Sequence, residues 1–192
     1  ILEGIDSSSI NYFDFVSMAS GNQTLTGSSG DDVILGASGI DSVTTKAGTD
    51  VILTYGGDDA ITVDGAGDKT IDGGTGTDSL TISNLSSMAD FSSKSYNKSS
   101  EYYSLTTSSS DVISFKAVES LVVGSNTYKL ILGDGSTRSW LGDIEAGYSR
   151  YDGVLFDSGN NAAYLFDQDS TSSTNITNLS TSGLSSYGIS NS

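Results

Sequence analysis

Six aspartates recur at nearly constant spacing in the first half of this chain, and their carboxylates are its clearest chemical feature. Successive members lie 9, 9, 9, 9 and 10 residues apart. They are Asp32, Asp41, Asp50, Asp59, Asp68 and Asp78. A carboxylate is a hard oxygen ligand of the kind that Ca²⁺ prefers. The series therefore predicts cation sites, and it directs attention to the segments that hold these side chains.

The segments around the aspartates repeat. Between residues 27 and 81 the chain divides into units of nine residues, with one unit of ten. The units are GSSGDDVIL (27–35), GASGIDSVT (36–44), TKAGTDVIL (45–53), TYGGDDAIT (54–62), VDGAGDKTID (63–72) and GGTGTDSLT (73–81). Residues 18–26, MASGNQTLT, have the glycine and the apolar residue in place, but Gln23 replaces the aspartate. This unit is interpreted as a degenerate capping repeat, which solenoids need at their ends.

The tandem units resemble the G-G-x-G-x-D-x-U-x repeat of RTX (repeats-in-toxin) proteins, where U is a large apolar residue. The resemblance covers about 55 residues directly. It implies a parallel β-roll in which two units make one coil and Ca²⁺ binds between turns of adjacent coils. Position eight then points inward, and glycines at positions one, two and four permit tight turns. Besides the six aspartates, the implied site residues are Gly27, Gly30, Gly36, Gly39, Gly48, Gly57, Gly73 and Gly76.

Stacked turns should lie about 18 residues apart, which predicts which carboxylates share an ion. The expected sites are Asp32/Asp50, Asp41/Asp59, Asp50/Asp68 and Asp59/Asp78, with Asp31 and Asp58 adding charge at position five. Three departures predict weaker sites: Thr45-Lys46 and Thr54-Tyr55 replace glycine pairs, and Ala66 replaces a glycine. Lys46 could occupy cation space. The extra residue of the fifth unit leaves open whether Thr70 or Ile71 points inward.

The outward positions predict an unusual surface. On one sheet, positions seven and nine are apolar: Val33 and Leu35, then Val51 and Leu53. On the other sheet they are mostly Ser and Thr. An exposed apolar sheet face marks an interface. We expect it to pack against residues before Gly21 or after Thr81, or to support self-association.

The expected fold class is all-β, a parallel β-roll followed by a β-rich flanking module. The expected divisions are an N-terminal flanking segment at 1–17, the roll at 18–81 and a C-terminal module at 82–192. Within that module, strands are predicted around 112–115, 120–123 and 127–132, with a hairpin formed by 154–157 and 164–167. Gly133-Asp134-Gly135 is a turn signal.

Composition excludes several functions. The chain of 192 residues carries 24 Asp and Glu against 8 Lys and Arg, a formal charge of −16, which argues against nucleic-acid binding. It lacks His and Cys, which removes Ser-His-Asp and Cys-His triads and His/Cys zinc sites. No apolar run approaches the roughly 20 residues of a membrane span. Because the chain begins at Ile1, we expect a processed product or an excised segment.

Two weaker candidates lie in the second half. Oxygen-bearing side chains at 157–169 suggest one more Ca²⁺ site, formed by Asp157, Asn160, Asn161, Asp167 and Asp169. Aromatic residues suggest a surface for a cell-surface glycan, although a core role is favoured; these are Trp140, Tyr148, Tyr151 and Tyr164.

The favoured function is a non-catalytic, Ca²⁺-dependent structural protein that is secreted or displayed on a bacterial surface. It would be a surface-layer, filament or adhesin subunit. One alternative is the C-terminal folding and secretion module of a type I-secreted hydrolase, which a longer precursor with a catalytic domain would favour. A second is an ice- or carbohydrate-binding solenoid, for which the row Thr44, Thr62 and Thr81 is short.

Overall fold

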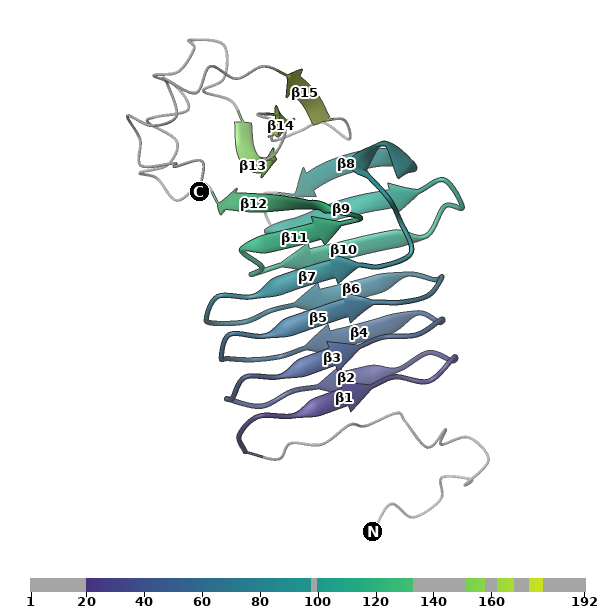
Figure 1. The fold of residues 1–192 in the computed structure, drawn as a ribbon, viewed down its shortest axis with the longest axis vertical. Coiled ribbons are helices and arrows are strands. Elements are labelled where there is room, and N and C mark those ends of the chain that lie inside the picture. Colours follow the sequence, from purple (N-terminus) through teal and green to yellow (C-terminus); the bar gives the residue numbers. More distant parts are fainter. Residues whose placement is uncertain (1–19, 98–99, 133–150, 158–161, 168–172, 178–192) are drawn as a thin grey trace.

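The computed structural model describes residues 20–97, 100–132, 151–157, 162–167 and 173–177. Within these residues the chain is almost entirely β-structure, arranged as two sheets that rise together along one long axis (Figure 1). The all-β expectation is confirmed. No helix in the described part of the chain is long and apolar enough to cross a membrane.

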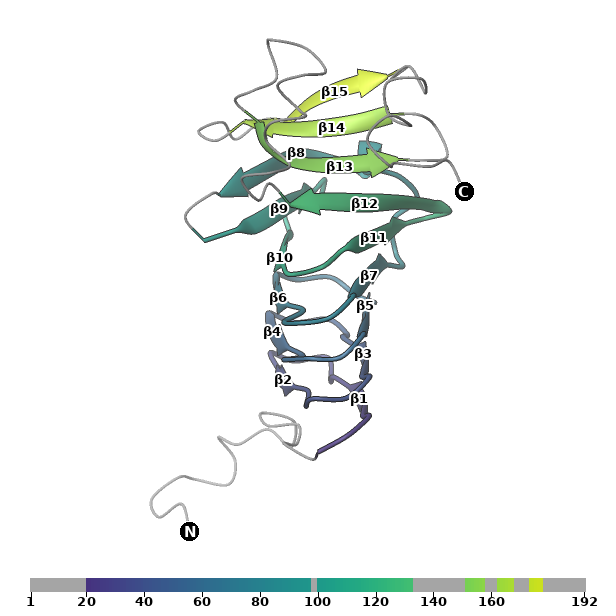
Figure 2. The same cartoon turned by 90° about the vertical axis from the view of Figure 1, so that its left-hand side faces the viewer.

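Short strands alternate between the two sheets. One sheet begins with β1 (Thr24–Thr26), β3 (Ser42–Thr44), β5 (Ala60–Val63) and β7 (Ser79–Ile82). The other begins with β2 (Val33–Leu35), β4 (Asp50–Leu53) and β6 (Lys69–Asp72). Every pairing among these strands is parallel. Viewed from the side, the two sheets face each other across a narrow interior, which is a parallel β-roll (Figure 2).

The nine-residue period explains this architecture. Two units return the chain to its starting sheet, so Ile34 pairs with Ile52 and Val43 with Ile61. Strand residues alternate in direction, and the middle residue of each triplet therefore faces the other sheet. The inward residues predicted at position eight are all buried, at 1% exposure or less: Ile34, Val43, Ile52, Ile61 and Leu80. In the ten-residue unit, Ile71 fills this place rather than Thr70.

The two sheets continue past Thr81, where the repeats end. After the short 3₁₀ helix η1 (Met88–Asp90), β8 (Phe91–Asn97) and β9 (Tyr102–Thr107) form an antiparallel pair. The chain then adds one more parallel strand to each sheet. β10 (Val112–Lys116) pairs with β6, and β11 (Ser120–Val123) pairs with β7. Both sheets are therefore continuous across residue 81, and the division expected there stays a prediction.

Antiparallel strands close the far end. β12 (Asn126–Leu132), β13 (Tyr151–Asp157), β14 (Ala162–Asp167) and β15 (Ser173–Thr177) extend the first sheet. The strands expected near 112, 120 and 127 are confirmed, as is the 154–167 hairpin. The turn at 133–135 lies outside the described residues. β8 and β9 were not expected, because the Ser-rich sequence there carries a weak apolar pattern.

Aromatic side chains fill the end of the roll. Tyr103 and Phe115 are fully buried and stack with ring centroids 5.5 Å apart, and Tyr96 lies 4.7 Å from Tyr103. These rings widen the interior where aliphatic triplets give way to longer strands. They join the aliphatic row to form one hydrophobic core.

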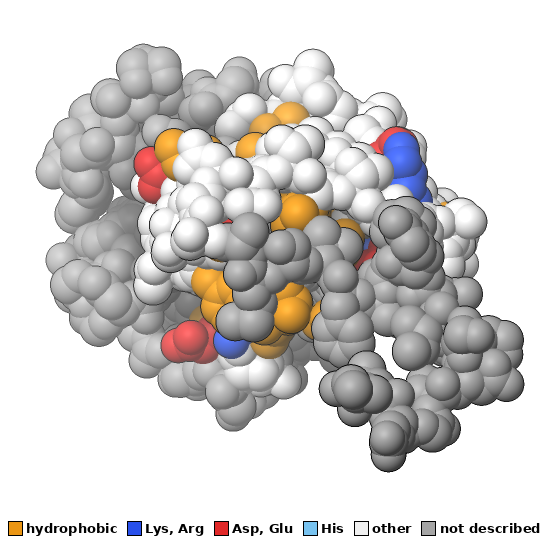
Figure 3. Space-filling model, turned by 90° about the horizontal axis from the view of Figure 1, so that it is seen from below, with side chains coloured by type: hydrophobic (Ala, Val, Ile, Leu, Met, Phe, Trp, Pro, Cys, Tyr) orange, Lys and Arg blue, Asp and Glu red, His pale blue; other side chains and the backbone are white. Residues whose placement is uncertain are grey.

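The apolar outer face is partly exposed. Val51 is 37% exposed, and Val33, Leu35 and Leu53 are half-buried. Ile40 and Tyr55, in the turns, are 57% and 48% exposed. Seen from the N-terminal end, hydrophobic side chains also reach the surface in patches among mostly uncharged groups (Figure 3). What covers the face stays a prediction.

Candidate metal sites in the stacked turns

The turns form two rows on opposite edges of the roll (Figure 1). The first turn row contains residues 27–32, 45–50 and 63–69, which lead into β2, β4 and β6; Asp50 and Lys69 are the first residues of β4 and β6. The second turn row contains residues 36–41, 54–59 and 73–78, which precede β3, β5 and β7. Each predicted pair of aspartates belongs to one of these rows.

Position-six carboxylates form a directed ladder. The Asp32 amide donates to Asp50 Oδ1 at 3.0 Å, and the Asp41 amide donates to Asp59 Oδ1 at 2.7 Å. The Asp59 amide donates to Asp78 Oδ1 at 2.8 Å. All five of these aspartates are buried, at 2% exposure or less. The structure thus joins Asp32 to Asp50, Asp41 to Asp59 and Asp59 to Asp78, each time through the backbone amide of the first residue and the carboxylate of the second.

The second oxygen of each carboxylate separates the aspartates into two groups. In the first two units it is satisfied within its own turn. Asp32 Oδ2 accepts from the Ser28 amide and Asp41 Oδ2 accepts from the Ala37 amide, both at 2.7 Å. Their Oδ1 atoms also accept hydrogen bonds, from Ser28 Oγ and the Gln23 amide respectively, so both oxygens of each carboxylate have a donor.

Asp59 and Asp78 differ because their Oδ2 atoms are buried and accept no hydrogen bond. Burial raises the pKa of the Asp59 carboxyl. Burial also raises the pKa of Asp78 to about 6, and the negative charges of Asp59, Glu119 and Asp58 act in the same direction. Buried polar atoms are normally paired. Two adjacent carboxylates with unpaired oxygens are therefore the place in the second turn row that is best suited to a cation.

The first turn row has a different residue at the matching place. On this edge, strand pairing places Asp50 opposite Lys69. On the other edge, Ala60 pairs with Ser79, so the residues just before them, Asp59 and Asp78, lie at the equivalent level. Lys69, not Asp68, therefore holds position six of the ten-residue unit. The expected Asp50/Asp68 pair is wrong for this reason, since the extra residue precedes Gly67 and moves Asp68 to position five.

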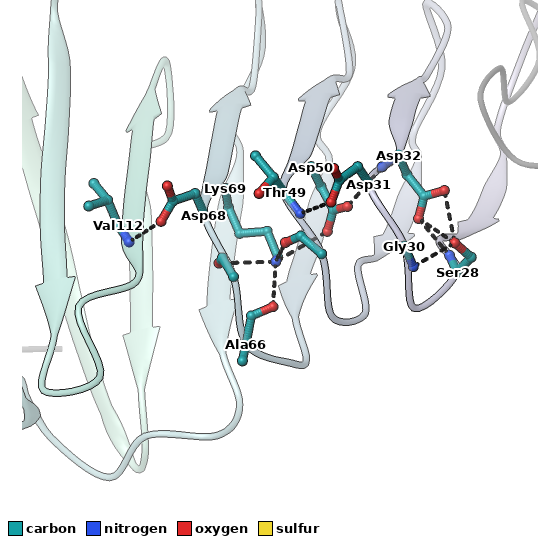
Figure 4. Close-up of polar contacts among 12 residues, drawn as sticks. Ser28, Gly30, Asp31, Asp32, Thr49, Asp50, Ala66, Asp68, Lys69 and Val112 are labelled. Atoms are coloured by element: carbon teal, nitrogen blue, oxygen red, sulfur yellow. Dashed lines mark hydrogen bonds and ion pairs between the residues drawn. The ribbon is translucent and has the colours of Figure 1, made fainter. Parts of the chain in front are cut away.

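Lys69 has a fully buried side chain whose ammonium points into the turn stack (Figure 4). Its Nζ donates to the carbonyl oxygens of Gly48, Ala66 and Gly67 at 2.5, 3.0 and 3.1 Å. It also lies 3.2 Å from Asp50 Oδ2. Burial still raises the pKa of Asp50, although the Asp32 amide and Lys69 act in the opposite direction.

Lys46, in contrast, stays out of the cation space that its position suggested. Its ammonium lies 3.0 Å from Asp64 Oδ2, and both side chains are about half exposed, at 43% and 51%. The expectation was therefore wrong about which lysine enters the stack. Lys46 holds position two of its unit, where the side chain points away from the roll into solvent.

Position-five side chains form a second ladder on the surface. Asp31 Oδ1 accepts from the Thr49 amide at 2.8 Å, and Asp58 Oδ1 accepts from the Thr77 amide at 2.9 Å. Asp68 Oδ1 accepts from the Val112 amide at 2.8 Å, which matches its shifted position (Figure 4). These carboxylates tie each turn to the following coil, so they do more than add charge.

The predicted glycines serve two geometric needs. At position one, a Cβ on Gly27, Gly36 or Gly73 would lie 2.9, 2.4 or 2.8 Å from the Oδ2 of its own position-six aspartate. At position four, Gly48, Gly57 and Gly76 have φ of 117°, 125° and 139° and approach the preceding coil's carbonyl closely. Gly30 and Gly39 provide two of those carbonyls. Thus all the predicted glycines lie in the turns that surround the carboxylates.

Threonines at position one do not disrupt the coils. Thr45 and Thr54 are fully buried, and the strands that follow keep their register. Thr54 Oγ1 donates to the Gly73 carbonyl at 2.7 Å, while Thr45 Oγ1 has no hydrogen-bond partner. Tyr55 next to Thr54 takes a positive φ of 68°, a conformation that suits the glycine expected there.

Glu119 completes the second ladder, and the repeat pattern does not predict it. Its Oε2 accepts from the Asp78 amide at 2.6 Å. It lies just before β11, which pairs with β7 as one further coil. The only sequence signal for this residue was its place: a glutamate just before the short strand β11, after the repeats have ended.

The site fits a hard cation if the turns supply most of the ligands. No cluster of three or more acidic side chains suited to hold a metal occurs in the described part of the chain. An ion near Asp59 and Asp78 would therefore depend on turn carbonyls for its other oxygens. The Lys69 ammonium shows that turn carbonyls of this roll converge on a cation. Ca²⁺ accepts such mixed sets of carboxylate and carbonyl oxygens.

The comparisons with known proteins add little to this picture. No protein-family model matches the sequence, and no curated protein matches it. Among solved structures, the extracellular lipase LipA from Serratia marcescens is similar at 21% identity and a TM-score of 0.31. The similarity covers 55% of this chain and 15% of the lipase chain. It is too weak to carry a functional argument.

Candidates from the second half of the chain lie outside the residues whose side chains are described. This applies to the proposed oxygen cluster of Asp157, Asn160, Asn161, Asp167 and Asp169, and to the aromatic set of Trp140, Tyr148, Tyr151 and Tyr164. They stay predictions.

Proposed function

We propose that this chain is a Ca²⁺-stabilised, non-catalytic structural protein of the extracellular space. The observation that carries the proposal is the pair of buried, unpaired oxygens on Asp59 and Asp78. Without a counter-ion, the two neighbouring buried carboxylates repel each other, and their Oδ2 atoms lack hydrogen-bond donors. A divalent cation between them removes both costs, and its binding energy then stabilises the fold.

Ca²⁺ suits this place better than other common metals. The chain has no His or Cys, so the nitrogen and sulfur ligands that zinc sites use are missing. Mg²⁺ demands a near-ideal octahedron and holds its water tightly, whereas Ca²⁺ accepts irregular sets of six to eight oxygens. Weak Ca²⁺ sites of extracellular modules are occupied at the Ca²⁺ levels found outside cells. The site chemistry therefore supports an extracellular location.

A structural role accounts for the rest of the molecule. The described strands are short, regular and stacked along one axis, and they present an apolar outer face with Val51 37% exposed. Such faces serve as interfaces. We propose that the face supports self-association into a surface layer, a filament or an adhesive assembly.

Circular dichroism during Ca²⁺ titration tests the metal part of the proposal. The wild-type chain should gain β-structure on going from EDTA to millimolar Ca²⁺, with Mg²⁺ at the same concentration as the comparison ion. The double variant Asp59→Asn/Asp78→Asn should lose most of this response. Asp31→Asn is the matched control, because Asp31 is exposed and its Oδ1 role survives the change.

Sedimentation velocity in the same solutions tests the assembly part. We expect oligomers in Ca²⁺ that disperse in EDTA, and their loss in Val51→Asp. A wild-type spectrum that is identical in EDTA and in Ca²⁺ would contradict the metal role. A monomer in both solutions would contradict the assembly role.

A further inference from the structure

The two edges of the roll use different residues at one equivalent level. On the second turn row, residue 78 at position six is an aspartate opposite Asp59. On the first turn row, residue 69 at position six is a lysine opposite Asp50. The Asp59/Asp78 pair therefore carries two formal negative charges, while the formal charges of the Asp50/Lys69 pair cancel. The two levels share the same spacing of 19 residues, but the Asp50 amide donates to the Asp68 carbonyl where the Asp59 amide donates to Asp78 Oδ1.

The surroundings of Lys69 Nζ consist of oxygen atoms. Three are turn carbonyls, two from its own turn and one from the preceding coil, and the fourth is the Asp50 carboxylate. The distances run from 2.5 to 3.2 Å. Carboxylate and carbonyl oxygens from two stacked turns are the ligand set that a calcium ion would use between coils. The ammonium thus lies where an ion would otherwise lie.

We infer that Lys69 is a tethered cation that replaces a divalent ion in the first turn row. The inference rests on the proposed function. The gap between Asp50 and residue 69 is closed to Ca²⁺ and needs none, while the equivalent gap between Asp59 and Asp78 takes the ion. This level of the first turn row is consequently held together at any Ca²⁺ concentration, whereas the equivalent level of the second turn row depends on the metal.

The register of the ten-residue unit places Lys69 at position six. The extra residue lies ahead of Gly67, whose φ of 98° and close approach to the Gly48 carbonyl are those of a position-four glycine. Asp68 then occupies position five, where it bonds the Val112 amide, and Lys69 occupies position six.

Two substitutions at Lys69 test the inference. Lys69→Asp restores the residue type of the other edge, and we expect about one additional bound Ca²⁺ per chain relative to wild type, measured by isothermal titration calorimetry. Lys69→Met leaves Asp50 unneutralised, so we expect its melting midpoint in EDTA to fall by roughly 10 °C and to recover partly in Ca²⁺. Lys46→Met removes an exposed lysine of the same turn row and should show neither effect.

Stability in EDTA provides a second readout that needs no metal. Adding Asp50→Asn to Lys69→Met removes both charges, so the double variant should melt above Lys69→Met alone. Equal Ca²⁺ stoichiometry in wild type and Lys69→Asp, with Lys69→Met no weaker than Lys46→Met, would overturn the inference. If wild type binds no Ca²⁺ but Lys69→Asp does, the lysine's role stands and the proposed function fails. If neither binds, both fail.

Discussion

The Asp59 amide donates to Asp78 Oδ1 at 2.8 Å, while the Oδ2 atoms of both residues remain buried without a partner. A backbone amide thus holds these two residues together, while the negative charges of their carboxylates repel each other. The backbone bond fixes the spacing of two coils, and the unpaired oxygens make that spacing costly in the absence of a cation. Four predictions follow from this arrangement and from the turns around it.

Asp78→Asn should stabilise the metal-free chain and weaken its response to Ca²⁺. The variant keeps an Oδ1 acceptor for the Asp59 amide and removes a buried charge. We expect a gain of about 1 kcal/mol in EDTA, or a few degrees in melting midpoint. In Ca²⁺ the order should reverse, with wild type melting higher. Thermal unfolding followed by circular dichroism measures both, and a variant less stable than wild type in EDTA would contradict the reasoning.

The metal-free chain should become more stable as the pH falls from 7 to 5. The pKa of Asp78 is about 6 in the fold against 3.8 for the ordinary carboxyl, so the folded state takes up a proton that the unfolded chain does not. Proton uptake by the folded state makes folding more favourable at lower pH. The gain accrues between about pH 6 and pH 4. Urea unfolding in EDTA across this range measures it, and Asp78→Asn should flatten the profile.

Gly48→Ala should damage the roll far more than Gly30→Ala, although both glycines hold position four of the first turn row. A Cβ on Gly48 would lie 2.3 Å from the Gly30 carbonyl oxygen, and its φ is 117°. A Cβ on Gly30 would meet only Ser28 Oγ at 3.7 Å. We expect a loss of about 1–3 kcal/mol for Gly48→Ala and little change for Gly30→Ala. Similar unfolding midpoints for the two variants would refute this account of the turns.

Glu119→Ala should loosen the last turn of the second row. The change removes the acceptor of the Asp78 amide and leaves that N–H group without its 2.6 Å bond. A lost buried bond of this kind costs about 1–3 kcal/mol. Amide hydrogen exchange should speed up at Asp78 while Asp50, on the other edge, keeps its protection. Glu119→Gln, which retains an acceptor, is the control.

The sequence was most informative where the period was unbroken. Nine-residue spacing with a central apolar residue predicted the inward row from Ile34 to Leu80 and the parallel pairing of alternate units. It failed at the unit of 63–72, because Asp68 lies nine residues after Asp59 and thus looked like position six. The turn is instead fixed by Gly67, since only a glycine tolerates the approach to the Gly48 carbonyl. Aligning glycines at position four, rather than aspartates at position six, would have placed Lys69 correctly.

Other elements had weaker sequence signals. β9 reads Tyr-Tyr-Ser-Leu-Thr-Thr, and only Tyr103 and Leu105 mark its buried face with large apolar groups. Glu119 lies 41 residues from Asp78, so no local pattern links them. Pairing between distant segments decides both features, and a period confined to residues 27–81 contains no information about it.

The carboxylate ladder of the second turn row has one direction. The carboxylates of Asp59, Asp78 and Glu119 each accept from an amide of the preceding coil, so each of these coils is completed by the next one. The last of these acceptors is Glu119, well beyond the repeats. A chain that ends before Glu119 therefore lacks the acceptor of the Asp78 amide, and its last turn in the second turn row is left incomplete.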